Sequence, residues 1–140
     1  PSIMANGTIA FDTLTTSDQV NTGTEKSIDT SYIFNGVAKA WAFKFSDGSG
    51  FGDSFNMSSI DDDGTGDYGL NYTNAFNNTS YVPVQSISGG VAAGNSDGHF
   101  AEVETANTTS AECENWYGDA GTNATFIDWP VRHTFFGDLA

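Results

Sequence analysis

An acidic, glycine-containing segment near the middle of the chain carries the side chains best suited to binding a metal ion. Its alternate positions are Asp61, Asp63, Thr65 and Asp67, with Gly66 among them. Hard oxygen ligands at this spacing are of the type that Ca²⁺ takes in proteins. The segment lacks the glutamate that closes an EF-hand loop, and no flanking helices can be recognised. The alternative is a β-hairpin turn in which Asp and Gly supply the backbone geometry without any metal.

Two pairs of glutamates could supply acid–base chemistry. Glu102 and Glu104 alternate along the chain, as do Glu112 and Glu114, so each pair would lie on one face of a strand. Paired carboxylates about 5–9 Å apart are the arrangement that hydrolyses glycosidic bonds. Alternating carboxylates are also typical of the solvated face of an antiparallel sheet, and we favour that interpretation.

The chain contains two histidines and one cysteine: His99, His133 and Cys113. A histidine beside a thiol or hydroxyl could form a nucleophile–base pair, but no nucleophile-elbow or cysteine-protease signature surrounds these residues. The spacing also argues against a zinc site. We therefore expect a partly buried, hydrogen-bonded His133, a packed Cys113 and no catalytic residue.

A group of aromatic and polar side chains lies late in the chain, around a glycine-rich turn. Its members are Asn115, Trp116, Tyr117, Asp119 and Asn123. An exposed ring can stack on the apolar face of a sugar while neighbouring polar side chains bind its hydroxyls. The alternative is that Trp116 closes one end of the fold. These residues are the candidate ligand-binding site.

The charge balance restricts the partners. Four basic residues face 18 carboxylates, which gives a formal net charge of −14. Such a chain repels phosphate backbones and anionic membrane surfaces, so we expect no nucleic-acid partner. No apolar run approaches the roughly 18 residues of a membrane span, so we expect no membrane insertion. The lone Cys113 excludes an internal disulfide and suits assembly in a reducing cytoplasm.

Period-two alternation dominates the chain from residue 37 onward, and no segment sustains helical spacing. The predicted strands are 37–45, 54–60, 67–73, 81–88, 99–106, 110–117 and 126–136. About seven short strands separated by Gly- and Asp-rich turns predict an all-β antiparallel sandwich. Residues 37–140 would form it, and the Thr-, Ser- and Asn-rich residues 1–36 would form an extended arm with one or two short strands.

The faces of these strands predict the core. Tyr68, Leu70 and Tyr72 share one face. So do Val131, His133 and Phe135. Phe76 would point inward from a polar connection, and Pro83 indicates an edge strand.

The strand at 37–45 has two distinct faces. Its aromatic face carries Val37, Trp41, Phe43 and Phe45, which we expect to enter the core. The other face carries Ala38, Ala40 and Ala42, followed by Lys44. We expect this alanine face to be either a weakly apolar solvent face or a flat contact surface for another copy of the chain.

Residues 38–88 resemble a module found at the C-terminal ends of bacteriophage tail fibres and related virion proteins. The shared order is an AKAW strand, a glycine-rich loop, an SFNMSSI strand, a DDGTGDY turn and a strand ending in an aromatic residue before Tyr81 and Pro83. The closing HTFFGDLA is similar to the VAVFGD-like end of such proteins. The variable host-contact loops would fall in residues 89–126.

This resemblance implies a non-enzymatic virion structural protein, the distal domain of a homotrimeric tail fibre. It would be assembled in the host cytoplasm, exposed outside the cell on the particle, and in contact with other virion proteins and a host receptor or glycan. Because the chain begins with Pro1, we expect a processed chain or a fragment of a longer fibre protein.

Other functions stay open. A capsid decoration protein would bind the head lattice instead of the host. The chain is also similar, more weakly, to trimeric H-type lectins, through Phe76, the Pro83–Val84 pair and the segment Trp129–Val131. A small glycan-degrading enzyme is the remaining alternative.

Overall fold

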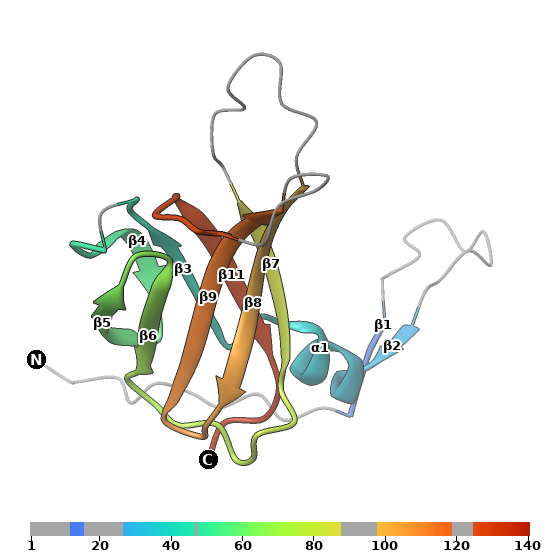
Figure 1. Ribbon diagram of the computed structural model, residues 1–140. Coiled ribbons are helices and arrows are strands. Elements are labelled where there is room, and N and C mark those ends of the chain that lie inside the picture. Colours follow the sequence, from blue (N-terminus) through green and yellow to red (C-terminus); the bar gives the residue numbers. More distant parts are fainter. Residues whose placement is uncertain (1–11, 16–26, 47, 88–97, 119–124) are drawn as a thin grey trace, which may run out of the picture. The chain divides into compact units, whose positions relative to one another are not determined.

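The computed structural model describes residues 12–15, 27–46, 48–87, 98–118 and 125–140 (Figure 1). The chain divides into two units, Pro1–Val37 and Ala38–Ala140. The smaller, N-terminal unit pairs β1 (Thr13–Thr15) with β2 (Ser27–Asp29) in an antiparallel hairpin, followed by helix α1 (Thr30–Gly36). None of the residues in these three elements is buried.

The helix α1 was not expected from the sequence, where this region was predicted to be extended. Asp29 caps it: the Asp29 side chain accepts a hydrogen bond of 2.7 Å from the backbone N–H of Ser31. A helix of 7 residues is barely two turns long, so apolar spacing cannot reveal it. The aspartate followed by small polar residues was the available signal.

The larger unit consists of two antiparallel sheets, which confirms the predicted all-β sandwich. The four-stranded sheet has the order β4 (Phe51–Phe55), β3 (Ala40–Lys44), β11 (Val131–Phe136), β7 (Val82–Ile87). The five-stranded sheet contains β5 (Met57–Gly64), β6 (Asp67–Tyr72), β9 (Ser110–Gly118), β10 (Thr125–Phe126) and β8 (Gly98–Ala106).

Strand β9 organises the five-stranded sheet. On one edge it pairs first with β6, through residues 110–114, and then with β10, through Trp116 and Tyr117. Asn115 marks the change of partner, because its backbone N–H donates to Gly66 O at 2.7 Å and its carbonyl accepts from the Ile127 N–H at 3.0 Å. Strand β8 runs along the other edge of β9 (Figure 1).

The core lies between the sheets and is largely aromatic. Tyr72 packs edge-to-face against Phe135 and Phe76, with ring centroids 5.5 and 4.9 Å apart. The predicted inward faces are confirmed, since the following side chains are buried: Tyr68, Leu70, Tyr72, Phe76, Cys113, Val131, His133 and Phe135. Pro83 lies on β7, an edge strand, as predicted.

The prediction for the two faces of β3 was wrong. Ala40, Ala42 and Lys44 are buried, at 0%, 2% and 1% exposure, whereas Trp41 and Phe45 are exposed. The register explains the reversal, because Ala40 pairs with Phe135 and Ala42 with His133 on β11. Large rings on β11 fill the core, and small side chains beside them leave the necessary room.

The proposed contact surface for another copy is therefore wrong for Ala40 and Ala42, whose side chains lie in this chain's own core. Ala38 is half-buried and precedes the strand.

Two predicted strands are each divided in two. The segment 54–60 breaks at Asn56, which has a left-handed backbone with φ of 57°. Its side chain accepts from the Asn74 N–H at 2.8 Å and donates to Asn74 O at 3.1 Å, which holds the chain as it passes from β4 to β5. The segment 126–136 breaks at Trp129 and Pro130, between β10 and β11.

Candidate functional site

The outer face of the five-stranded sheet carries a row of three aromatic side chains. The register aligns Phe126 of β10, Trp116 of β9 and Phe100 of β8 across the sheet. The Phe100 and Trp116 rings are stacked, with centroids 4.6 Å apart and an angle of 24° between their planes. Phe100 and Phe126 are about half exposed, at 47% and 48%. We call these three residues the aromatic row.

A row of carboxylates lies next to it. Asp67 of β6, Glu114 of β9 and Glu102 of β8 are paired across the sheet, two residues along each long strand from the aromatic row. We call them the acidic row. Glu102, Glu114, Trp116 and Phe126 line a shallow groove of about 290 Å³. The groove therefore combines exposed rings with hydrogen-bond acceptors.

The carboxylates of the acidic row repel one another. Partial loss of hydration raises the pKa of Glu114 above its ordinary value, and the negative charges of Glu104, Asp67 and Glu102 raise it further. Like charges directly opposite each other on neighbouring strands destabilise a sheet. The sheet thus maintains this concentration of charge at a cost to its stability.

Replacing Glu114 with glutamine is expected to stabilise the sandwich unit by about 0.5 kcal/mol near neutral pH. A raised carboxyl pKa means that the folded state disfavours the ionised form, so the cost appears as the pH rises through the ordinary glutamate range. The gain should vanish in acid, where Glu114 is protonated. Thermal unfolding at both pH values measures it. Glu112→Gln is the control, because Glu112 pairs with Gly69 and Thr105 and not with a carboxylate. An equal gain for both variants would contradict this explanation.

The predicted ligand-binding group is only partly assembled. Trp116 belongs to the aromatic row, and Tyr117 is half-buried on the alternate face, paired with His99. Asn115 is fully buried, at 0% exposure, so its prediction as a ligand-binding residue was wrong. Its alternation with Trp116 along β9 turns it inward. Asp119 and Asn123 lie outside the described residues.

Phe100, Phe126 and Asp67 were not recognised as part of this site. Same-face spacing does link Phe100 to Glu102, and Glu114 to Trp116. The register that brings the two strands together includes a bulge between Val103 and Thr105. Spacing within one strand cannot reveal that register.

The acidic segment forms the hairpin between β5 and β6. Asp61 accepts a hydrogen bond of 2.8 Å from the Asn71 side chain, and the Gly64 N–H donates to Asp62 at 3.2 Å. Gly66 has a left-handed φ of 72°. Across the described ranges, no three Asp, Glu, His or Cys side chains gather in a way that could hold a metal ion. The alternative of a hairpin turn without metal therefore fits the positions of Asp61, Asp63, Thr65 and Asp67.

A directional chain of hydrogen bonds crosses the core between the sheets. Tyr68 donates its hydroxyl proton to Asn115 Oδ1 at 3.0 Å, so His133 Nε2, also 3.0 Å from Tyr68, must donate to the hydroxyl oxygen. His133 Nδ1 is then the acceptor for Gln85 Nε2 at 3.1 Å. The chain ends where Asn115 Nδ2 donates to Trp129 O at 3.5 Å.

Burial keeps the titratable side chains of this part of the core in their neutral forms. It raises the pKa of Tyr68 and of Cys113 far above their ordinary values, and together with Lys44 it lowers the pKa of His133 to about 3. His133 was expected to be partly buried and hydrogen-bonded, and it is fully buried with both ring nitrogens bonded. Neither His133 nor Cys113 is reachable by a substrate.

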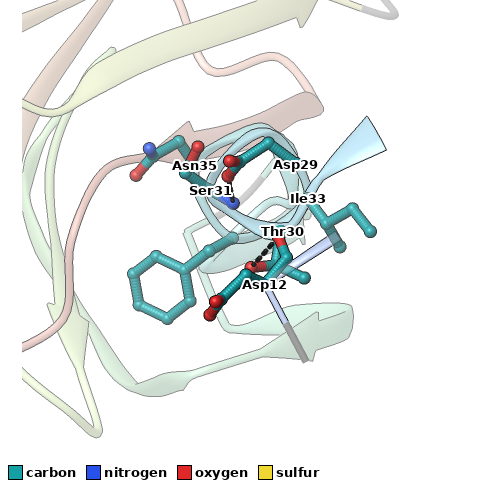
Figure 2. Close-up of a pocket in the computed structure, with 7 residues that line it drawn as sticks. Asp12, Asp29, Thr30, Ser31, Ile33 and Asn35 are labelled. Carbon is teal, nitrogen blue, oxygen red and sulfur yellow. Dashed lines mark hydrogen bonds between the residues drawn. The ribbon is translucent and has the colours of Figure 1, made fainter. Parts of the chain in front are cut away.

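The N-terminal unit contains an open hollow, shown in Figure 2. Thr30 Oγ1 donates to the Asp12 carbonyl at 3.0 Å, and the Asp29 carboxylate is engaged in capping α1. Ile33 and Phe34 supply its apolar wall, and both are exposed. These hydrogen bonds of the hollow therefore stabilise the hairpin and the helix of the N-terminal unit.

Neither a protein-family model, nor a curated protein, nor a solved structure gives a significant match to this chain. Within the described residues, no helix has the length and apolar character needed to cross a membrane.

Proposed function

We propose that this chain is a non-enzymatic, glycan-binding β-sandwich of a bacteriophage virion, the distal domain of a tail fibre that contacts the host surface. The observation that supports it most is the stacked Phe100–Trp116 pair beside the carboxylates of the acidic row, in which Phe100 is about half exposed and Trp116 is half-buried. Apolar rings that are exposed on the surface of a protein lower its solubility. They commonly mark a surface that a ligand covers.

The chemistry of the groove favours a particular class of glycan. Rings of the aromatic row can stack on the C–H face of a pyranose, and Glu102 and Glu114 can accept hydrogen bonds from its hydroxyls. With a net charge of −14, the chain repels uronic and sialic acids. We infer that the ligand is a neutral or amino sugar.

The virion assignment, the location on the particle and the trimer are supported by the resemblance of residues 38–88 to tail-fibre modules. Three copies would compensate for a shallow, weak site through avidity. Because Ala40 and Ala42 are buried, the trimer contact needs another surface. The outer face of the four-stranded sheet, where Trp41, Phe55 and Val84 are exposed, supplies the apolar area.

Replacing Trp116 with alanine is expected to weaken binding to neutral host-surface oligosaccharides at least about tenfold, the scale of a central aromatic contact. Trp116→Phe keeps a ring in the stack and should retain most of the affinity. Calorimetric titration with free oligosaccharides measures a single site without avidity, and circular dichroism verifies that both variants fold. Equal affinity for wild type and Trp116→Ala would refute a glycan site in the aromatic row.

Glycan hydrolysis is the second candidate, and one observation favours it. Glu114, with its raised pKa, lies opposite Glu102, as an acid and a second carboxylate do in glycosidases. Release of reducing sugar from host polysaccharide, lost in Glu114→Gln while binding persists, would establish hydrolysis in place of passive binding.

A capsid decoration protein would instead be located on the phage head by imaging of particles.

A further inference from the structure

Lys44 and Asn115 reach the same backbone carbonyl oxygen from opposite sheets of the core. Lys44 lies on β3 and Asn115 on β9, and they are 1% and 0% exposed. Lys44 Nζ donates to Trp129 O at 3.4 Å, and Asn115 Nδ2 donates to the same oxygen at 3.5 Å. The two side-chain nitrogens are therefore bridged by a single carbonyl oxygen in a site closed to water.

The Asn115 carboxamide is polarised. The Tyr68 hydroxyl donates to its Oδ1 atom at 3.0 Å, and His133 Nε2 stands behind that hydroxyl, also at 3.0 Å. A donor placed on a carbonyl oxygen stabilises the negative charge that develops there when a nucleophile adds to the carbon. Lys44 Nζ lies 4.4 Å from the centre of the same Tyr68 ring, so the amine and the donor are on one side of the core.

We propose that Lys44 and Asn115 react with each other to form an intramolecular isopeptide bond that links the two sheets. The Lys44 ammonium releases a proton, and the amine adds to Asn115 Cγ while Tyr68 stabilises the oxygen. The Cγ–Nδ2 bond then breaks, Nδ2 takes up the two protons that Nζ has given up and leaves as ammonium, and an Nζ–Cγ amide remains. In balance, one ammonium group and one carboxamide give one secondary amide and one ammonium ion, with no oxidant and no other reactant.

The geometry supplies what this reaction requires. Folding holds the nucleophile and the electrophile on one carbonyl oxygen, so their addition is intramolecular. A lysine amine in a desolvated site is a recognised nucleophile. Exclusion of water also protects the intermediate and the product from hydrolysis.

Peptide mapping of the intact, folded wild-type protein by mass spectrometry tests the proposal. Trypsin cannot cleave after an acylated lysine, so we expect one cross-linked peptide spanning residues 40–132, lighter by one ammonia than its sequence mass. Lys44→Arg should restore the full mass. Asn115→Asp should lose one water in place of one ammonia.

The mapping is needed because cyclisation of an asparagine before a glycine, as at Asn35–Gly36, also removes ammonia. That side reaction leaves Lys44 cleavable and persists in Lys44→Arg. Recovery of separate peptides 40–44 and 45–132 at full mass from the wild-type protein would overturn the proposal. This outcome does not depend on whether any variant folds.

Discussion

Replacing Gly66 with alanine is expected to destabilise the sandwich unit by about 3 kcal/mol. Two effects add. The residue has a left-handed φ of 72°, which costs a non-glycine residue roughly 1–2 kcal/mol. A Cβ atom there would also lie 2.7 Å from Ile127 N and closer still to the Asn115 carbonyl oxygen, and overpacking against backbone costs about 1–3 kcal/mol more. Gly66 lies where β9 changes partner from β6 to β10, so neither neighbour can move freely.

Chemical denaturation of the full chain measures this effect, and Gly118→Ala is the matched control. Gly118 is on β9 too, but a Cβ atom there meets nothing within 4 Å, and its φ is not in the left-handed region. We expect that control to be neutral or slightly stabilising. A Gly66→Ala protein as stable as the Gly118→Ala protein would show that the junction of β6, β9 and β10 is looser than described.

The sandwich unit is also expected to lose stability in mild acid, by up to about 1.4 kcal/mol per pH unit below the ordinary histidine range. Burial, and to a lesser extent the charge of an unreacted Lys44, lower the pKa of His133 from 6.5 to about 3. Since the folded state keeps His133 neutral while the unfolded chain takes up a proton, stability is complete above pH 6.5 and falls as the pH decreases toward 3. Burial is the larger cause of the lowered pKa, so this loss of stability does not require the charge of Lys44.

The comparison of wild type with His133→Gln isolates this contribution. Glutamine cannot be protonated, so we expect the variant to be less stable near neutral pH but to have a flatter dependence between about pH 7 and pH 5, above the main carboxyl titration. If the stability of His133→Gln depended on pH as steeply as that of the wild type, another titrating group would be responsible for the loss of stability in acid.

The sequence predicts those parts of the fold in which one face of a strand is clearly apolar. Along β6, Tyr68, Leu70 and Tyr72 alternate with Asp67, Gly69 and Asn71, so the direction of burial is unambiguous. On β3 both faces are apolar, and the choice between rings and alanines depends on the strand beside them. Because His133 and Phe135 of β11 already fill the core there, the alanines of β3 lie inward.

The candidate site depends on pairing that the sequence does not specify. Phe100 and Trp116 lie on β8 and β9, and Phe126 reaches the same row only because β10 replaces β6 beside Asn115. A bulge on β8 falls at Glu104, between Val103, which pairs with Cys113, and Thr105, which pairs with Glu112. The alternation on β9 identified Trp116 as a candidate, whereas its neighbours in the row required the structure.

The glycan site in the aromatic row is tested most directly by the indole N–H signals of the folded protein in an NMR titration with host-surface oligosaccharides. The chain has 3 tryptophans, so each indole can be assigned with single substitutions. We expect the Trp116 signal to move with ligand concentration while that of Trp41, on the opposite sheet, stays in place. Movement of Trp41 with a stationary Trp116, or no change in either signal, would contradict a glycan site on the five-stranded sheet.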